Sequence, residues 1–579
     1  MRPLLRYGVR IAVAGYFVLG ILVLVVRHWV LPSIDSYRPD IEQALADAIS
    51  RPVAIRAIDA DWRGLWPRLR IQGLDIRDQE GRSALGFENV EVDVAWSSLW
   101  HLEPRFARLE LIAPTLEIRR TAAGRLFVAG LEIDPQSQSG GFSDWLLEQD
   151  RVVIRNAAVT WYDEQRQAPP LMLSRLNFDL RNSGRHHRFG LTADPPEGLA
   201  TRLDVRGDFR GQDLEALAAG RGEAYVALDY TDLAGWRTWV DYPLELSRGQ
   251  GGLRLWLGFE HEQLEKLTAD VRLSQVLLRL SKDLPPLDLE RLDGRVAGQL
   301  LVAGYAGTVK RLALATRNGI RIEPTDLDFH WTPAADRRPA RGEANASHLD
   351  LGSLAALAGH LPLDKALREK LTAFGPRGRL DDVRLSWTGE PEQLTAYGFK
   401  ARFADLGLNA QGATPGFSGL KGRVEGDEKG GVLELGGRNA ALDLPTVFPE
   451  RRLSFESLEA KASWRLEDGW VNARLEKAAF QNQDAAGEAA GSYRSNGSGP
   501  GSIDLSARLT RADGGAVWRY MPLVVNLDTR SWLRRSIIGG KATATLRLKG
   551  DLSHFPFADG SGIFEVKGPF QGASLDYAP

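Results

Sequence analysis

The sequence predicts a mainly β protein: a long, curled and twisted antiparallel β-sheet that forms an elongated, taco-like hydrophobic groove. An N-terminal transmembrane helix and a few short helices complete the prediction. Three observations support it. Apolar and charged residues alternate along nearly the whole chain, turns rich in Gly, Pro and Asn separate the alternating stretches, and a single uninterrupted apolar run stands near the N-terminus.

The alternation is clearest in residues 202–211, "RLDVRGDFRG", where every other residue from Arg202 to Arg210 is charged. In a strand, successive side chains point to opposite faces, so one face is charged and the other apolar. We expect the apolar faces of four such strands to line the groove. The lining residues are Val90, Val92, Val94 and Trp96; Leu203, Val205 and Phe209; Leu253, Leu255, Leu257 and Phe259; and Leu546 and Leu548.

The apolar run, residues 11–26, follows three arginines at positions 2, 6 and 10. At about 1.5 Å per residue it is roughly 24 Å long, which suits a membrane span if Arg27 extends towards the headgroups. Residues 31–36 and those before them lack a small-x-small cleavage site, which favours an uncleaved anchor over a signal peptide. The arginines keep the N-terminus cytoplasmic. The expected anchor residues are Ile11, Leu19, Leu22, Val26 and Trp29.

We therefore divide the chain into a cytoplasmic tip and anchor (1–35), a helix followed by a β segment (36–150), and an elongated repetitive β-groove (151–579). Short helical insertions are expected near 232–246, 354–372 and 514–538, each followed by Gly and an alternating strand, as in a loose internal repeat. Residues 482–501 are small and polar, which predicts a flexible loop.

The number of strands favours a single sheet. One strand about every 13 residues would give on the order of 40 strands, whereas twisted open sheets rarely exceed about ten. No linker-like segment divides the chain into separate sandwiches. A long curled sheet is therefore the expected architecture.

Composition argues against several function classes. The chain has 73 basic and 75 acidic residues, so no bulk positive charge attracts nucleic acid, and it has no cysteine to form a thiolate site. Its nine histidines are scattered, and the neighbours His186 and His187 point to opposite faces of a strand, so no metal site is expected. The acidic pairs Asp59/Asp61 and Asp163/Glu164 lack a nucleophile motif and fit solvated positions better. We expect no catalytic residues, no cofactor and no enzyme activity.

Three stretches resemble a known family. Residues 55–78 contain a Trp-x-Gly-x-x-Pro element at Trp62, Gly64 and Pro67, and residues 87–120 contain a "SLW" turn at Ser98. A Gly-marked hairpin follows at Gly124, and residues 152–196 continue the similarity. Together with the N-terminal anchor, these features resemble the AsmA-like proteins of the Gram-negative envelope, most closely the YhdP type of bridge-like lipid-transfer proteins. Members of that family are considerably longer, so the chain resembles an N-terminal portion, and residues 36–150 its AsmA-like segment.

The resemblance implies an inner-membrane protein with one span and most of its chain in the periplasm. It implies that phospholipids travel along the apolar groove between the inner and outer membranes, which supports outer-membrane lipid homeostasis and barrier function. Expected partners are phospholipids, the inner membrane, and the outer membrane or an envelope protein at the C-terminal end. Two alternatives remain: an assembly chaperone for outer-membrane proteins, whose groove would hold unfolded strands, and a structural β-solenoid with a dry interior.

Overall fold

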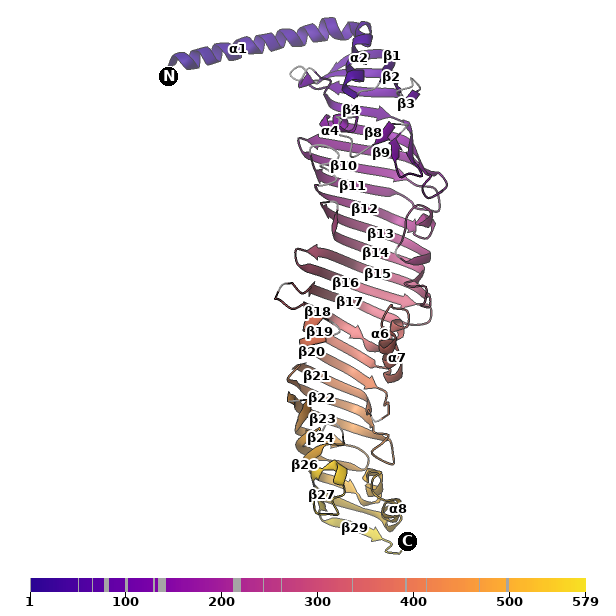
Figure 1. The fold of residues 1–579 in the computed structure, drawn as a ribbon, viewed down its shortest axis with the longest axis vertical. Helices are drawn as coiled ribbons and strands as arrows, with labels where there is room; N and C mark the ends of the chain where they lie inside the picture. The colour runs from indigo at the N-terminus through magenta and orange to yellow at the C-terminus, as the bar shows by residue number, and fades with distance from the viewer. Residues whose placement is uncertain are drawn as a thin grey trace. The chain divides into compact units, whose positions relative to one another are not determined.

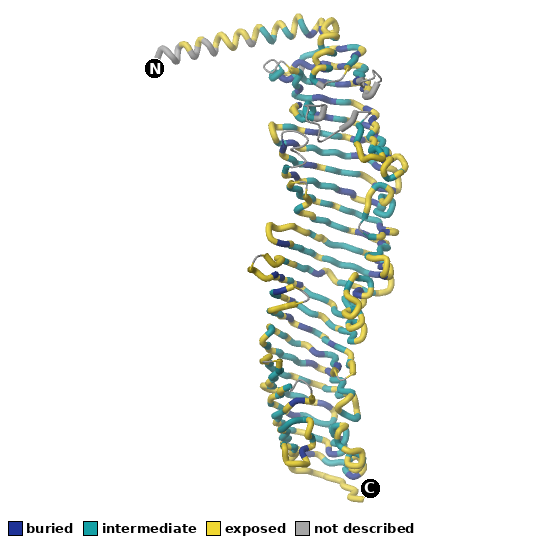
Figure 2. The backbone as a smooth tube through the Cα atoms, in the orientation of Figure 1, coloured by how far each residue is buried: buried dark blue, intermediate teal, exposed yellow. Residues whose placement is uncertain are grey.

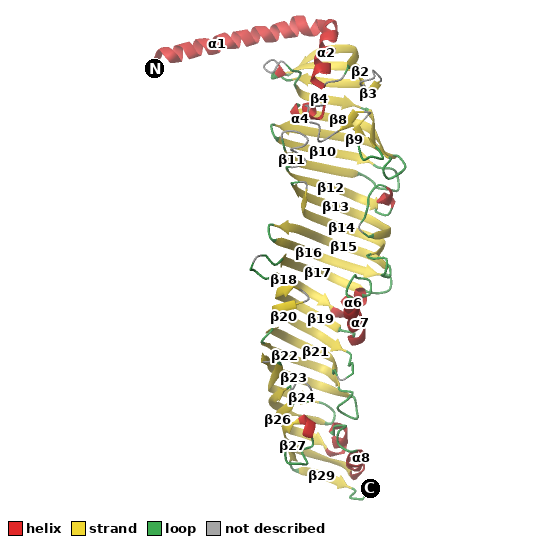
Figure 3. Ribbon diagram, viewed as in Figure 1, coloured by secondary structure: helices red, strands yellow, loops and turns green. Residues whose placement is uncertain are grey.

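The computed structural model describes residues 2–49, 52–64, 66–77, 83–98, 103–128, 131–133, 142–211, 220–242, 244–261, 263–335, 337–390, 393–412, 414–467, 469–495 and 499–578. The chain forms two compact units, Met1–Leu277 and Leu278–Pro579. Both consist mainly of β-strands with few helices (Figures 1 and 3), which confirms the predicted fold class.

Unit 1 begins with helical structure that runs from the anchor to the first strand. Its helices are α1 (Arg2–Val25), the π-helical turn η1 (Val26–Val30), the 3-10 segment η2 (Leu31–Tyr37), α2 (Arg38–Ile49), α4 (Phe142–Glu148) and the 3-10 turn η3 (Gly235–Thr238). Its strands are β1 (Val53–Arg63), β2 (Trp66–Arg77), β3 (Ser83–Val94), β4 (Phe106–Ile112), β5 (Thr115–Arg120), β6 (Leu126–Val128), β7 (Leu131–Ile133), β8 (Arg151–Asp163), β9 (Leu171–Ser183), β10 (His186–Asp194), β11 (Leu203–Arg210), β12 (Arg221–Asp232), β13 (Glu245–Glu260) and β14 (Gln263–Arg279), the last of which crosses the boundary.

Unit 2 contains the remaining described strands and several short helices. Its strands are β15 (Leu287–Leu301), β16 (Gly304–Thr316), β17 (Arg321–Thr332), β18 (Arg341–Asp350), β19 (Arg377–Glu390), β20 (Gln393–Leu408), β21 (Gly416–Asp427), β22 (Gly430–Asp443), β23 (Arg452–Glu467), β24 (Trp470–Gln481), β25 (Ala485–Arg494), β26 (Ser502–Asp513), β27 (Ile537–Asp551), β28 (Ile563–Lys567) and β29 (Phe570–Leu575). Its helices are α6 (Leu351–Ala358), α7 (Lys365–Phe374), α8 (Leu527–Ser536), and the 3-10 turns η4 (Gly514–Tyr520) and η5 (Leu552–His554).

Most strands pair antiparallel with the next strand in sequence. In unit 2 this holds from β15 to β27, after which β28 and β29 both pair with β27. Unit 1 departs from the predicted antiparallel sheet at two pairings, because β8 runs parallel to both β4 and β5. Between β4 and β8 the chain passes through β5, β6, β7 and α4. Strand β8 then runs in the same direction as β4, so the two strands pair in parallel.

Two expectations about the strands were wrong. The described residues contain 29 strands rather than about 40, because many strands are longer than expected, up to 17 residues in β14. The segment expected to be a flexible loop contains strand β25. Its glycines fit closely packed neighbours: Gly487 pairs with Phe480, and a Cβ on Gly491 would lie 2.3 Å from the Asp504 carbonyl oxygen.

Bulges recur near the middle of many strands. Residues with positive φ occupy them, including Asn156, Arg175, Arg311, Asp382 and Asp405, with φ of 47° to 53°. Each bulge inserts one extra residue and bends the strand. Beyond the bulge, odd- and even-numbered residues have therefore exchanged faces of the sheet. A row of bulges thereby curls the sheet.

Candidate functional site

The apolar face of unit 1 contains an unbroken row of directly paired residues, which we call row 1. It crosses ten strands, and at every step the residue is Ile, Leu, Val or Phe. Its members, from β1 to β13, are Ile58, Ile71, Val90, Leu111, Ile154, Phe178, Leu191, Val205, Val226 and Leu255. Three of the predicted lining residues, Val90, Val205 and Leu255, therefore belong to one row although they are far apart in sequence.

On the same strands, rows next to row 1 contain most of the other predicted lining residues of unit 1. Val92 pairs with Leu69 and Leu109, and Leu257 pairs with Ala224. Leu203 and Leu253 both pair with Leu228. Phe209 and Phe259 both pair with Gly222, and Val94 pairs with Phe106. Trp96 lies in a turn beyond β3, where its ring centroid is 6.0 Å from that of Trp62.

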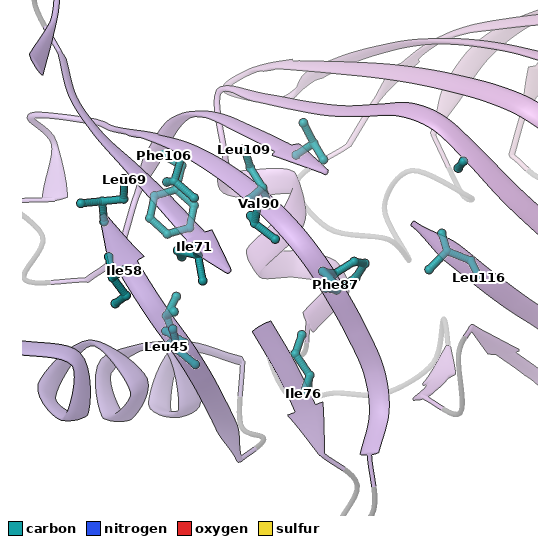
Figure 4. Packing of buried hydrophobic residues seen from close by; sticks show 14 of the residues in the cluster. Leu45, Ile58, Leu69, Ile71, Ile76, Phe87, Val90, Phe106, Leu109 and Leu116 are labelled. Atoms are coloured by element: carbon teal, nitrogen blue, oxygen red, sulfur yellow. The ribbon is translucent and has the colours of Figure 1, made fainter. Parts of the chain in front are cut away.

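The two ends of row 1 differ in burial. Ile58, Ile71 and Val90 are 3%, 4% and 1% exposed, inside a cluster to which residues of α2 and α4 contribute. Figure 4 shows Leu45 of α2 directed towards the side chains of β2, β3 and β4. By contrast, Val205 and Leu255 are only partly buried. The apolar face is therefore roofed near β1–β9 and less covered near β11–β13.

Unit 2 has a row of its own, row 2, which runs from β18 to β28 and consists of apolar residues and one glycine. Its members are Leu349, Leu380, Phe403, Gly422, Leu435, Ala460, Ala478, Ala489, Ala507, Leu546 and Val566. The predicted residue Leu546 is a member, and Leu548 lies in the adjacent row, paired with Leu505 and Phe564.

Much of this face of unit 2 is accessible to solvent. Phe329 of β17 and Leu385 of β19 are 42% and 45% exposed, and both pair with Ala344 between them. Figure 2 shows intermediate and exposed residues along most strands of this unit. Globular cores do not leave aromatic and aliphatic side chains half exposed in rows, so this surface has the character of a binding face.

In unit 1, the face of β10–β12 opposite row 1 is charged, and several of its charges are paired. Arg206 contacts Asp204 at 2.7 Å, Arg188 contacts Asp208 at 2.9 Å, and the Arg206 guanidinium lies 5.6 Å from the centre of the Tyr225 ring. Burial acts to raise the pKa of the Asp208 carboxyl, but hydrogen bonds from His186 and Arg188 lower it overall. This face is suited to water rather than to lipid.

Aromatic side chains cover glycines of the neighbouring strands on the apolar face. Phe189 and Phe209 stack with centroids 6.0 Å apart, and a Cβ on Gly207 would lie 2.3 Å from the Phe189 ring. Likewise, a Cβ on Gly342 would lie 2.1 Å from the Trp387 ring. Glycine is needed because the ring occupies the place of its side chain, so the face stays smooth and apolar without a gap.

Three of the four residues in the two acidic pairs form ion pairs: Asp61, Asp163 and Glu164. Asp163 is paired with Arg120 and Arg166, and Asp61 with Arg70. Burial acts to raise the pKa of Asp163, but hydrogen bonds from Arg120 and from the Arg166 backbone lower it overall, so this carboxyl is not suited to act as a general acid. His187 contacts the Asn182 side chain at 2.8 Å. Among the described residues, no group of three His, Asp or Glu side chains could hold a metal ion.

The continuous helical segment Val13–Ala48, which runs from α1 into α2, is long and apolar enough to cross a membrane, by length and composition. Of the predicted anchor residues, Trp29 is exposed, and Leu22 and Val26 are partly exposed. Ile11 and Leu19 lie within α1, but their side chains are outside the described part.

Two features of the site were not predicted. One is the Ala-rich part of row 2, whose small side chains make the apolar alternation weak in the sequence. The other is a cavity of about 190 Å³ beneath α2 and α4, lined by residues of ten elements. Period-two spacing in residues 485–494 could have revealed the first, but nothing local reveals the second.

The chain was compared with known proteins. A family model described as "YhdP protein" matches residues 1–579. The chain is similar to the intermembrane phospholipid transporter YhdP of Escherichia coli (strain K12), with 24% identity over 574 residues, which are 95% of this chain and 43% of that protein. It thus spans less than half the length of this curated relative. No solved structure matches. Because the family model covers every residue, the suspected resemblance is confirmed, and the chain belongs to the YhdP family.

Proposed function

We propose that this protein carries phospholipid between the inner and outer membranes along its apolar sheet face. In this proposal α1 anchors the chain in the inner membrane, residues from Ser36 onward lie in the periplasm, and the activity supports outer-membrane lipid homeostasis and barrier function. The single observation that carries the proposal is the pair of apolar rows, in which each strand presents an apolar residue or a glycine directly opposite that of its neighbour.

The energetics of lipid transfer explain the need for such a face. Moving one 16-carbon acyl chain through water costs on the order of 12 kcal/mol, at about 0.8 kcal/mol per methylene, and a phospholipid has two chains. An apolar surface that is continuous from strand to strand removes most of that cost at each step. The charged opposite face keeps the sheet soluble. The name of the E. coli relative, an intermembrane phospholipid transporter, agrees with this role.

Native mass spectrometry of the purified full chain tests the proposal. We expect phospholipid masses bound to the folded protein, because the half-exposed Phe329 and Leu385 need an apolar partner. A protein without bound lipid would contradict the proposal and favour the solenoid. Bound outer-membrane polypeptides in place of lipid would contradict it and favour the chaperone.

A further inference from the structure

The cavity beneath α2 and α4 is distinct from the rest of the apolar face because these two helices cover part of it. Strands β1–β6, β8 and β9 form its walls, and Leu45, Trp145 and Leu146 contribute from the two helices. Every described residue that lines it is apolar or aromatic, and most, including Ile71, are less than one-tenth exposed. Figure 4 shows several of them directed into the same interior.

Hydrogen bonds and an aromatic contact hold α4 over this cavity. The fully buried Gln149 accepts a hydrogen bond from Phe106 N–H at 2.9 Å and donates to the Trp145 carbonyl at 2.6 Å. The side chain of Asn182 donates to the carbonyls of Leu146 and Gln149. Phe106 and Trp145 pack edge to face, 5.7 Å apart. The roof is therefore built into the fold, and the cavity beneath it is a formed site.

The size of the cavity limits what it can hold. Apolar cavities of about 150 Å³ bind benzene or xenon rather than water, because water finds no polar partner there. If a methylene takes a volume similar to that of a water molecule in the liquid, about 30 Å³, then 190 Å³ accommodates about six methylenes. A complete two-chain phospholipid is far too large, and a phosphate would be buried without a hydrogen-bond donor.

The cavity also connects to row 1. Phe178 lines the cavity and pairs with Leu191, which pairs in turn with Val205 on the less covered part of the face. We infer that the cavity binds the methyl end of one acyl chain of a phospholipid whose remaining part lies along β10–β13. This inference rests on the proposed function and adds that the roofed end holds one chain end in a fixed orientation.

A pair of photoreactive phospholipids tests the inference. The full chain is reconstituted in vesicles of phosphatidylethanolamine and phosphatidylglycerol that contain phosphatidylethanolamine with a diazirine either near the methyl end of one chain or next to its ester. After irradiation, labelled peptides are mapped by mass spectrometry. We expect the methyl-end probe to label peptides containing Leu116 and Leu146 several-fold more than the ester-end probe, and the ester-end probe to label peptides of β11–β13.

Two matched variants sharpen the result. Leu111→Trp places a large ring in the cavity and should abolish labelling there, whereas Arg188→Trp, on the charged face of β10 and outside the cavity, should preserve it. Thermal unfolding checks that both variants fold, and the comparison of the two probes on the wild-type chain stands without them.

The outcomes separate this inference from the proposed function. Equal labelling of the cavity by both probes, or labelling of β11–β13 without the cavity, would overturn the inference and leave transport intact. Absence of labelling at both places would overturn the proposed function itself.

Discussion

Glu42 Oε1 in α2 accepts a hydrogen bond from the backbone N–H of Ile55 in β1, at 2.6 Å. Asp35 accepts from the N–H of Ile58, and Arg38 donates to the carbonyl of Arg56. These side chains satisfy backbone groups on the edge of β1 that β2 does not use. An open strand edge invites pairing with other chains, so the helices that follow the anchor protect the first edge of the sheet.

Replacing Glu42 by Ala should lower the free energy of unfolding by about 1–3 kcal/mol, because the Ile55 N–H loses its partner in a partly buried place. Urea unfolding measures the loss, and hydrogen exchange at Ile55 should become faster. Glu88→Ala is the control, since Glu88 pairs with Arg56 on the exposed surface. If both variants behaved alike, the edge would not depend on Glu42.

The aromatic cover of the glycines gives a second prediction. Gly207→Val should destabilise unit 1 by about 1–3 kcal/mol, because a Cβ there would lie within 2.5 Å of both the Phe189 and Phe209 rings. Gly190→Val, in the neighbouring strand, should be tolerated, since no atom lies within 4 Å of its Cβ position. Thermal unfolding of the two variants compares them, and a stable Gly207→Val protein would show that the rings do not need the glycine.

Aspartate substitutions distinguish the roofed part of row 1 from the open part. Val90→Asp should destabilise severely, by more than about 4 kcal/mol, because the carboxylate would be buried without a partner. Val205→Asp should keep the fold, because its carboxylate can reach water, yet it should reduce bound phospholipid. Arg206→Ser, on the charged face, should change neither property.

Unfolding midpoints and lipid extraction measure these effects. Severe unfolding of Val205→Asp would indicate a sealed core at β11 and would contradict the proposed lipid path.

The pH dependence of stability follows from Asp163. Its pKa is lowered in the folded state, so its contribution is complete above its unfolded pKa, near 3.9, and is lost as the pH falls through the lower folded value. The free energy of unfolding should therefore decrease below about pH 4. Urea unfolding between pH 7 and pH 3 measures this, and Asp163→Asn should make the decrease shallower. An identical slope in the variant would show that Asp163 does not contribute.

The sequence predicted the fold class and the faces of individual strands because alternation is local. Spacing alone places Leu203, Val205 and Leu255 on an apolar face, and the strand pairings then join Val205 and Leu255 through Val226. Bulges limit this reasoning: Leu380 and Val383, three residues apart, pack into the same cluster because Asp382 has a positive φ. The cavity could not be predicted, since its walls come from elements up to 133 residues apart, from Leu45 to Phe178.

The most direct test of the lipid path compares two neighbouring residues of β13. Leu255 belongs to row 1, whereas Trp256 points to the opposite face, where it packs against Tyr225. A photoreactive p-benzoylphenylalanine is introduced at either position in the full chain, and the cells are irradiated. The mass of the purified protein is then measured by mass spectrometry to detect lipid adducts. The proposed path predicts a phospholipid adduct at position 255 and none at position 256. Adducts of equal yield at both positions, or no adduct at 255 in a folded protein, would contradict it.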